Sequence, residues 1–211
     1  MLKDEDRIFK NLYGLDNPTT ANFGRQCLMA RRFAERGVRF IQISHSYKWD
    51  QHDNLRADHQ RNASEVDQPI AALLQDMKAR GLLEDTLIMW GGEFGRTPWS
   101  QDLSGTAPIE THGREHQPES FTAFLAGGGV KRGFSFGETD EFGHKAVKDV
   151  VNHYDYHATL LHLFGLDAGK LSFARPGGVG TLLDGQPGKI VGDLLKRPPA
   201  ATAPIGGSAT T

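Results

Sequence analysis

The sequence predicts an α/β fold in which helices cover a mostly parallel sheet. Segments with helical and with strand-like periodicity alternate along the chain and are joined by short connections, which is the pattern of doubly wound α/β proteins. Residues 87–90 are apolar without interruption, as expected for a parallel strand that is covered on both faces. The chain has 211 residues, enough for one domain with a full core.

The first elements are predicted from capping residues and apolar spacing. Residues 1–17 are polar with scattered apolar side chains and predict a short arm or a fragment of an element whose partner is missing. A helix is predicted to start at Asn17, which precedes a proline of the first turn, and to stop at Gly37. Phe23 lies on its apolar stripe. Residues 38–44 alternate between apolar and polar side chains and predict a strand.

The later elements continue the alternation. A helix is predicted to begin at Ser64 and to end at Gly81, with Pro69 in its first turns, where proline costs little. The remaining predicted elements are strands at residues 85–90 and 120–126 and a helix at residues 155–166.

The overall composition is that of a globular protein, with 38% hydrophobic and 24% charged residues. The net charge of −2 provides no attraction to nucleic acid or to an anionic membrane, so neither is a predicted partner. No apolar run has the length of a transmembrane helix. We expect a single domain over residues 1–197 and a disordered tail over residues 198–211, where the composition is of low complexity.

Polar side chains gather in two loops that follow predicted strands. The first loop carries Asp50 and His52, and the second carries Glu93 and later His116. Loops that leave the same edge of a parallel sheet converge, so we expect these four side chains to form one metal site. Imidazoles mixed with carboxylates suit zinc, iron or manganese better than calcium, which stays the fourth candidate. Such an ion would polarise an ester or activate water near neutral pH.

Each of these residues also has a simpler interpretation. A pair such as Asp50 and His52 occurs by chance in polar loops. Glu93 could cap a helix or form a salt bridge with Arg96, and His116 could be an ordinary surface or core histidine. The sequence leaves these alternatives open.

Other charged and aromatic groups near the loops are candidates for supporting roles. Arg96 and Arg114 are predicted to bind an anionic substrate through bidentate hydrogen bonds, with salt bridges to nearby carboxylates as the alternative. His112 is a weaker metal-ligand candidate. His45 and His59 flank the first loop and are candidates for hydrogen bonding to the ligands.

Several motifs together resemble the domain-of-unknown-function 1501 family, a bacterial group of sulfatase-like proteins within the alkaline phosphatase superfamily. The motifs are WDQHDN (49–54), KARGLLEDT (78–86), GGEFGRTP (91–98), GREH (113–116), FLAGGGVKRG (124–133), TDEFGHKAV (139–147) and YDYHATLLHLFGLD (154–167). The resemblance covers roughly residues 15–197 and keeps the order of the family's motifs.

The resemblance implies an alkaline-phosphatase-like three-layer α/β sandwich that hydrolyses sulfate or phosphate esters. Asp50, His52 and His116 match metal ligands of the superfamily. Glu93 stands where the superfamily has an Asp-His pair, and Phe94 follows it instead of histidine. The implied substrate is a small anionic ester or a sulfated glycan, and the implied location is periplasmic or secreted.

Family members resemble longer chains, in which the nucleophile and the first metal-binding aspartate lie before the region matched here. We therefore expect this chain to be the C-terminal portion of such a protein, with a sheet that is incomplete at its N-terminus. A missing N-terminal half or a second copy of the chain would then be its partner. The alternative function is a non-catalytic family member that serves as a binding or structural domain.

Overall fold

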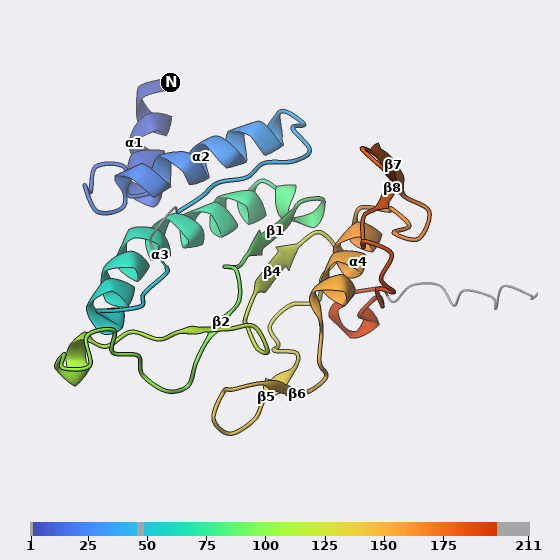
Figure 1. Ribbon diagram of the computed structural model, residues 1–211. Helices are drawn as coiled ribbons and strands as arrows, with labels where there is room; N and C mark the ends of the chain where they lie inside the picture. The colour runs from blue at the N-terminus through green and yellow to red at the C-terminus, as the bar shows by residue number, and fades with distance from the viewer. Residues whose placement is uncertain (1, 46–48, 198–211) are drawn as a thin grey trace, which may run out of the picture. The chain divides into compact units, whose positions relative to one another are not determined.

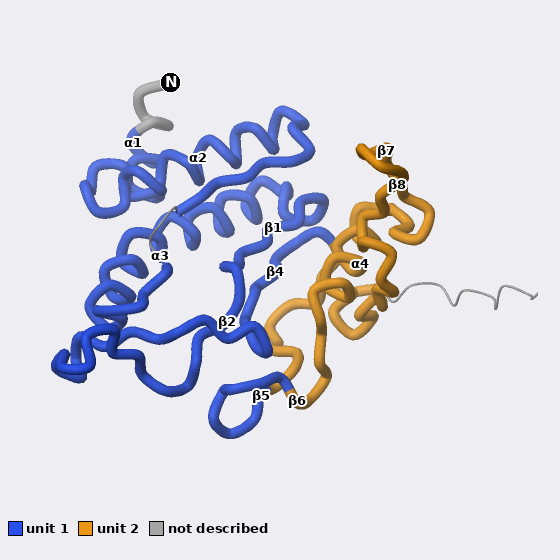
Figure 2. Tube along the Cα trace, in the orientation of Figure 1, with its two compact units in different colours: residues 1–128, 139–146 blue, residues 129–138, 147–211 orange. Residues whose placement is uncertain are grey.

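The computed structural model describes residues 2–45 and 49–197, without the side chains of residues 2–6 (Figure 1). The tail predicted to be disordered, residues 198–211, lies outside the described residues. The chain forms two compact units, the first comprising residues 1–128 and 139–146 and the second comprising residues 129–138 and 147–211 (Figure 2). The single domain over residues 1–197 stays a prediction.

Three helices form most of the first unit: α1 (Leu2–Leu12), α2 (Ala21–Glu35) and α3 (Leu55–Ala79). A short 3-10 helix, η1 (Leu82–Glu84), follows α3. Residues from α2, α3 and the connections around them share one buried apolar cluster, which comprises Tyr13, Phe23, Cys27, Leu28, Val66, Ala72, Leu73, Met77 and Leu83. The helix predicted between Asn17 and Gly37 is confirmed as α2, but it begins at Ala21 and not at the predicted cap Asn17. Burial of its apolar stripe supplies its stability.

One prediction for the helices is wrong, and another is decided between its two alternatives. Residues 2–12 form an element, helix α1, and Phe9 packs against the apolar cluster. Helix α3 begins at Leu55, well before Ser64. The Ser64 hydroxyl donates to the Arg61 carbonyl at 2.6 Å, so a side chain that can cap a helix is instead satisfied inside one. Pro69 consequently lies in the interior of α3, where it is buried.

The strands of the first unit form short ladders. Strand β1 (Leu87–Trp90) pairs with β4 (Phe124–Gly127) in antiparallel orientation, so that Trp90 faces Phe124. Strand β2 (Gly95–Arg96) pairs with β3 (His116–Gln117), also antiparallel. Between them lies the 3-10 helix η2 (Ile109–Thr111). The sheets are two-stranded, so the parallel three-layer sandwich stays a prediction.

The strand predicted at residues 38–44 is not present, because these residues have no regular secondary structure. Ile43 packs against the apolar cluster, whereas Phe40 is 79% exposed. The alternation in the sequence therefore corresponds to a partly buried connection between α2 and the first polar loop.

The second unit is built around α4 (His153–Leu163), with Asn152 accepting a hydrogen bond from the Asp155 amide at its start. It also contains the hairpin β7 (Ser172–Arg175) and β8 (Gly178–Thr181) and the 3-10 helix η3 (Gly192–Leu194). The short strands β5 (Glu138–Thr139) and β6 (Ala146–Lys148) pair with each other. Among the described helices, none is long and apolar enough to cross a bilayer.

Candidate metal centre

Three segments of the first unit bring the predicted site residues together: the loop 49–54 before α3, strand β2, and the chain from η2 to β3. The β2–β3 ladder places Arg96 opposite His116. The Asn54 amide donates to the Thr111 carbonyl at 2.7 Å and thereby fixes the first loop against the chain before β3. A Cβ at Gly113 would overlap the backbone of His52, so the close approach of the two segments requires glycine there.

Asp50, His52 and His116 form a compact triangle of ligand atoms. The Asp50 Oδ1 atom lies 3.0 Å from His116 Nε2 and 3.2 Å from His52 Nε2. The two imidazole Nε2 atoms are 3.1 Å apart, and the rings are stacked with centroids 4.9 Å apart. Within the described residues, these three side chains are the group that could hold a metal ion.

The triangle has the dimensions of a metal site. A tetrahedral ion with bonds of about 2.0–2.1 Å separates its ligand atoms by ~3.3–3.4 Å, and an octahedral ion with similar bonds separates neighbouring ligands by ~2.8–3.0 Å. The observed separations of 3.0–3.2 Å lie between these values. Zinc and an octahedral ion such as manganese or iron(II) therefore both fit with shifts of a few tenths of an ångström. Glu93 Oε1, which lies 3.5 Å from His116 Nε2, is the nearest further carboxylate oxygen to that imidazole.

Hydrogen bonds fix the orientation of His52. Gln101 donates from Nε2 to the Glu115 carboxylate at 2.7 Å, so its Oε1 atom faces His52 Nδ1 at 2.9 Å. Because that oxygen can only accept, the Nδ1 atom of His52 carries the proton. The Nε2 lone pair then faces Asp50 and His116, which is the tautomer that a metal ligand needs.

Arg96 is the cation that lies against the triangle. Its Nη2 atom donates to Asp50 Oδ1 at 2.5 Å and to the Trp49 carbonyl at 3.3 Å. Its Nη1 atom donates to the Arg114 carbonyl at 3.2 Å. The hydrogen bond from Arg96, followed by that from His116, lowers the pKa of Asp50 to about 2. The Asp50 carboxylate is therefore ionised at any pH at which imidazoles could bind a metal.

The family model described as "Protein of unknown function (DUF1501)" matches residues 1–195. The chain belongs to this family. No curated protein and no solved structure matches it, so the membership in DUF1501 establishes a relationship without assigning an activity.

Of the site residues predicted for this DUF1501 chain, the structure brings Asp50, His52 and His116 into one cluster, with Glu93 and Arg96 at its border. Their binding of a metal stays a prediction. Arg114 is part of the same strand connection, but its guanidinium donates to the Thr97 carbonyl at 2.6 Å. His112 bonds to Ser100 and to the Ala107 carbonyl and is outside the triangle.

Sequence reasoning missed Gln101 and Glu115. Glu115 precedes His116 directly, and its side chain accepts a hydrogen bond from the His116 amide at 2.9 Å, which lowers the pKa of Glu115. Its place beside a predicted ligand could have indicated a supporting role. Gln101 lies in a polar loop and carries no such signal, because only the folded backbone brings it to His52.

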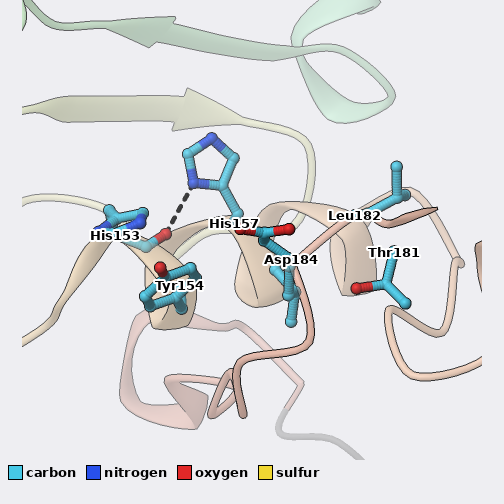
Figure 3. A pocket seen from close by; sticks show the side chains of 7 residues that line it. His153, Tyr154, His157, Thr181, Leu182 and Asp184 are labelled. Atoms are coloured by element: carbon cyan, nitrogen blue, oxygen red, sulfur yellow. Dashed lines mark hydrogen bonds between the residues drawn. The ribbon is translucent and has the colours of Figure 1, made fainter. Parts of the chain in front are cut away.

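Each unit of the described chain contains a cavity. One, of about 180 Å³, borders the metal centre and is lined by His52, Asp53, Gln101 and His112 among others. The other, of about 290 Å³, belongs to the second unit and lies beside the first turns of α4 (Figure 3). There His157 Nδ1 donates to the His153 carbonyl at 2.7 Å. Among the described residues, those that line this second cavity do not form a group of three metal ligands like Asp50, His52 and His116 in the first unit.

Proposed function

We propose that this DUF1501 chain is a sulfatase-like, metal-dependent hydrolase of sulfate or phosphate esters. The observation that carries the proposal is the triangle of Asp50, His52 and His116, with an arginine against the same carboxylate oxygen. Two imidazoles and one carboxylate are a ligand set that leaves coordination positions open for substrate or water. The resemblance of the sequence to sulfatase-like proteins supports the choice of ester.

The residues of this chain would divide the work as follows. Asp50, His52 and His116 would hold a divalent ion, with Glu93 as the adjacent carboxylate; zinc, iron, manganese and calcium are the candidates. The ion would supply Lewis-acid polarisation of the ester group. Arg96 would bind an oxygen of the anionic group and stabilise charge in the transition state. Its guanidinium is already held by the Trp49 and Arg114 carbonyls, so the side chain would lose little conformational entropy on binding the substrate.

The exposure of the ligands favours a second function, a metal-binding domain without catalysis. The Asp50 side chain is 60% exposed and the two histidines are 30% and 31% exposed. Hydrolases gain from excluding water around the reacting group. If this chain binds metal without hydrolysing esters, the second function describes it better.

The test is the metal content of the purified chain, together with turnover of an aryl sulfate and an aryl phosphate. We expect one transition-metal ion per chain, with loss of the ion in His116→Ala and weaker retention in Glu93→Ala. His153→Ala, which removes an exposed histidine of the second unit, is the matched control and should keep the metal. A folded wild-type chain that binds no divalent ion would refute the proposal, and metal without turnover would leave the binding domain.

A further inference from the structure

A chain of hydrogen bonds connects helix α3 to the loop that carries Asp50. The His45 Nε2 atom lies 2.8 Å from Glu65 Oε2 on α3, and the Trp49 indole donates to His45 Nδ1 at 2.9 Å. Trp49 directly precedes Asp50 in the sequence. The side chains of His45 and Glu65 are only 13% and 20% exposed, so water competes little for these hydrogen bonds.

The chemistry of the partners determines the state of His45. An indole N–H can only donate and a carboxylate can only accept. Both hydrogen bonds are therefore satisfied by the neutral imidazole with its proton on Nε2. In this form His45 connects Trp49 to Glu65 with no unpaired ring nitrogen.

The connection reaches the metal centre through the backbone of Trp49. The Trp49 carbonyl accepts a hydrogen bond from Arg96 Nη2, and the same Nη2 atom donates to Asp50 Oδ1. The Trp49 ring also packs edge-on against His59 at 5.1 Å and Trp90 at 6.3 Å. The hydrogen bond to His45 adds a directional constraint to this packing, because it requires the indole N–H to point at His45 Nδ1.

We propose that His45 is a positioning residue: through Trp49 it sets the place of the Asp50 carboxylate and thereby the metal affinity of the centre. The inference rests on the proposed metal centre and goes beyond it, because His45 touches neither ligand nor substrate. Hydrogen bonds that orient ligands typically change metal affinity by about 10–100-fold when they are removed.

The test compares affinity for cobalt(II), followed by its visible absorption, with the thermal stability of the metal-free chain. His45→Phe keeps an aromatic ring beside Phe23 but removes both hydrogen bonds. Trp49→Phe keeps an aromatic ring but removes the indole donor and part of the ring packing. We expect both to weaken cobalt binding by about tenfold or more. His153→Phe, which changes an exposed histidine of the second unit, is the control and should bind as the wild type does.

Rescue separates positioning from general support. His45→Gln can accept from Trp49 and donate to Glu65, so it should recover most of the affinity that His45→Phe loses. Wild-type affinity in His45→Phe, or a loss that His45→Gln does not restore, would overturn the proposal. If the wild-type chain binds no cobalt, the metal centre itself fails and the role of His45 fails with it.

Discussion

Replacing Asp76 with alanine should destabilise the first unit by about 3 kcal/mol. Asp76 accepts hydrogen bonds from Tyr13 at 2.9 Å and Arg31 at 2.8 Å. Arg80 donates a third hydrogen bond at 2.6 Å. The Asp76 carboxylate on α3 thereby connects Tyr13, which follows α1, and Arg31 of α2 with the C-terminal end of α3. The side chains of Arg31 and Asp76 are 4% and 6% exposed. Removing one partner of a buried ion pair costs about 3–5 kcal/mol, and the value should be at the low end because Glu35 still pairs with Arg31 at 2.7 Å.

Tryptophan fluorescence during urea unfolding is a suitable assay, because Trp49, Trp90 and Trp99 are all in the first unit. The matched control is Asp58→Ala on the same helix. Its pair with Arg61 is at the surface, with side chains 25% and 56% exposed, and should contribute at most about 1 kcal/mol.

Equal unfolding midpoints for Asp76→Ala and Asp58→Ala would show that the buried ion pair contributes no more to stability than the exposed one. A second comparison isolates the charge. Replacing Arg31 with methionine in the Asp76→Ala background removes a buried cation that has lost one of its two carboxylate partners, and should recover part of the loss. No recovery would mean that packing of the arginine stem, and not the ion pair, stabilises the helices.

Three further predictions concern the site and the core. Gln101→Ala should weaken metal binding by about 10–100-fold with little change in the free energy of unfolding, because the Gln101 oxygen would no longer hold the proton of His52 on Nδ1. Competition with a chelator measures the metal affinity. Arg96→Gln should lower kcat/KM for an anionic ester by about 100-fold when both chains are saturated with metal; an unchanged kcat/KM at saturating metal would contradict it. Burial raises the pKa of the Cys27 thiol to about 12, so Cys27 should not react with an aromatic disulfide at pH 8 until the chain is unfolded. The Cys27 thiol ionises at a lower pH in the unfolded chain than in the folded one, so the free energy of unfolding should fall as the pH rises from the ordinary thiol range toward 12. Urea titrations at several pH values would detect this loss.

Apolar spacing predicted those elements whose stability comes from burial. The stripe of Phe23 and Cys27 predicted α2, because the helix buries the same side chains that form the pattern. The apolar run before Gly91 predicted β1, although Met89 and Trp90 are exposed there. Local polar signals were less informative. Ser64 was a plausible helix start by type, but tertiary contacts of the preceding residues extend α3 to Leu55, which overrides a weak capping preference.

The candidate site was predicted in part because its ligands are chemically distinctive. Asp50, His52 and His116 stood out as residue types that bind metals, and the structure brings them together. Their orientation could not be read from the sequence, since it depends on Gln101 and Glu115 from the chain between β2 and β3. A residue that acts only through hydrogen-bond geometry has no signature of its own until the backbone is placed.

The charges at the centre decide which ligand it should attract first. Asp50 and Glu93 both lie within ion-pair distance of Arg96, and the Glu115 carboxylate lies 3.7 Å from His52 Nδ1. Three carboxylates against one guanidinium leave an excess of negative charge at pH 7, which attracts a divalent cation and would be neutralised by it. An anionic ester therefore gains little from long-range attraction before the metal is bound. Its recognition would depend on the directed hydrogen bonds of Arg96 and on the ion itself, so metal should bind before substrate and substrate binding should be undetectable in the metal-free chain.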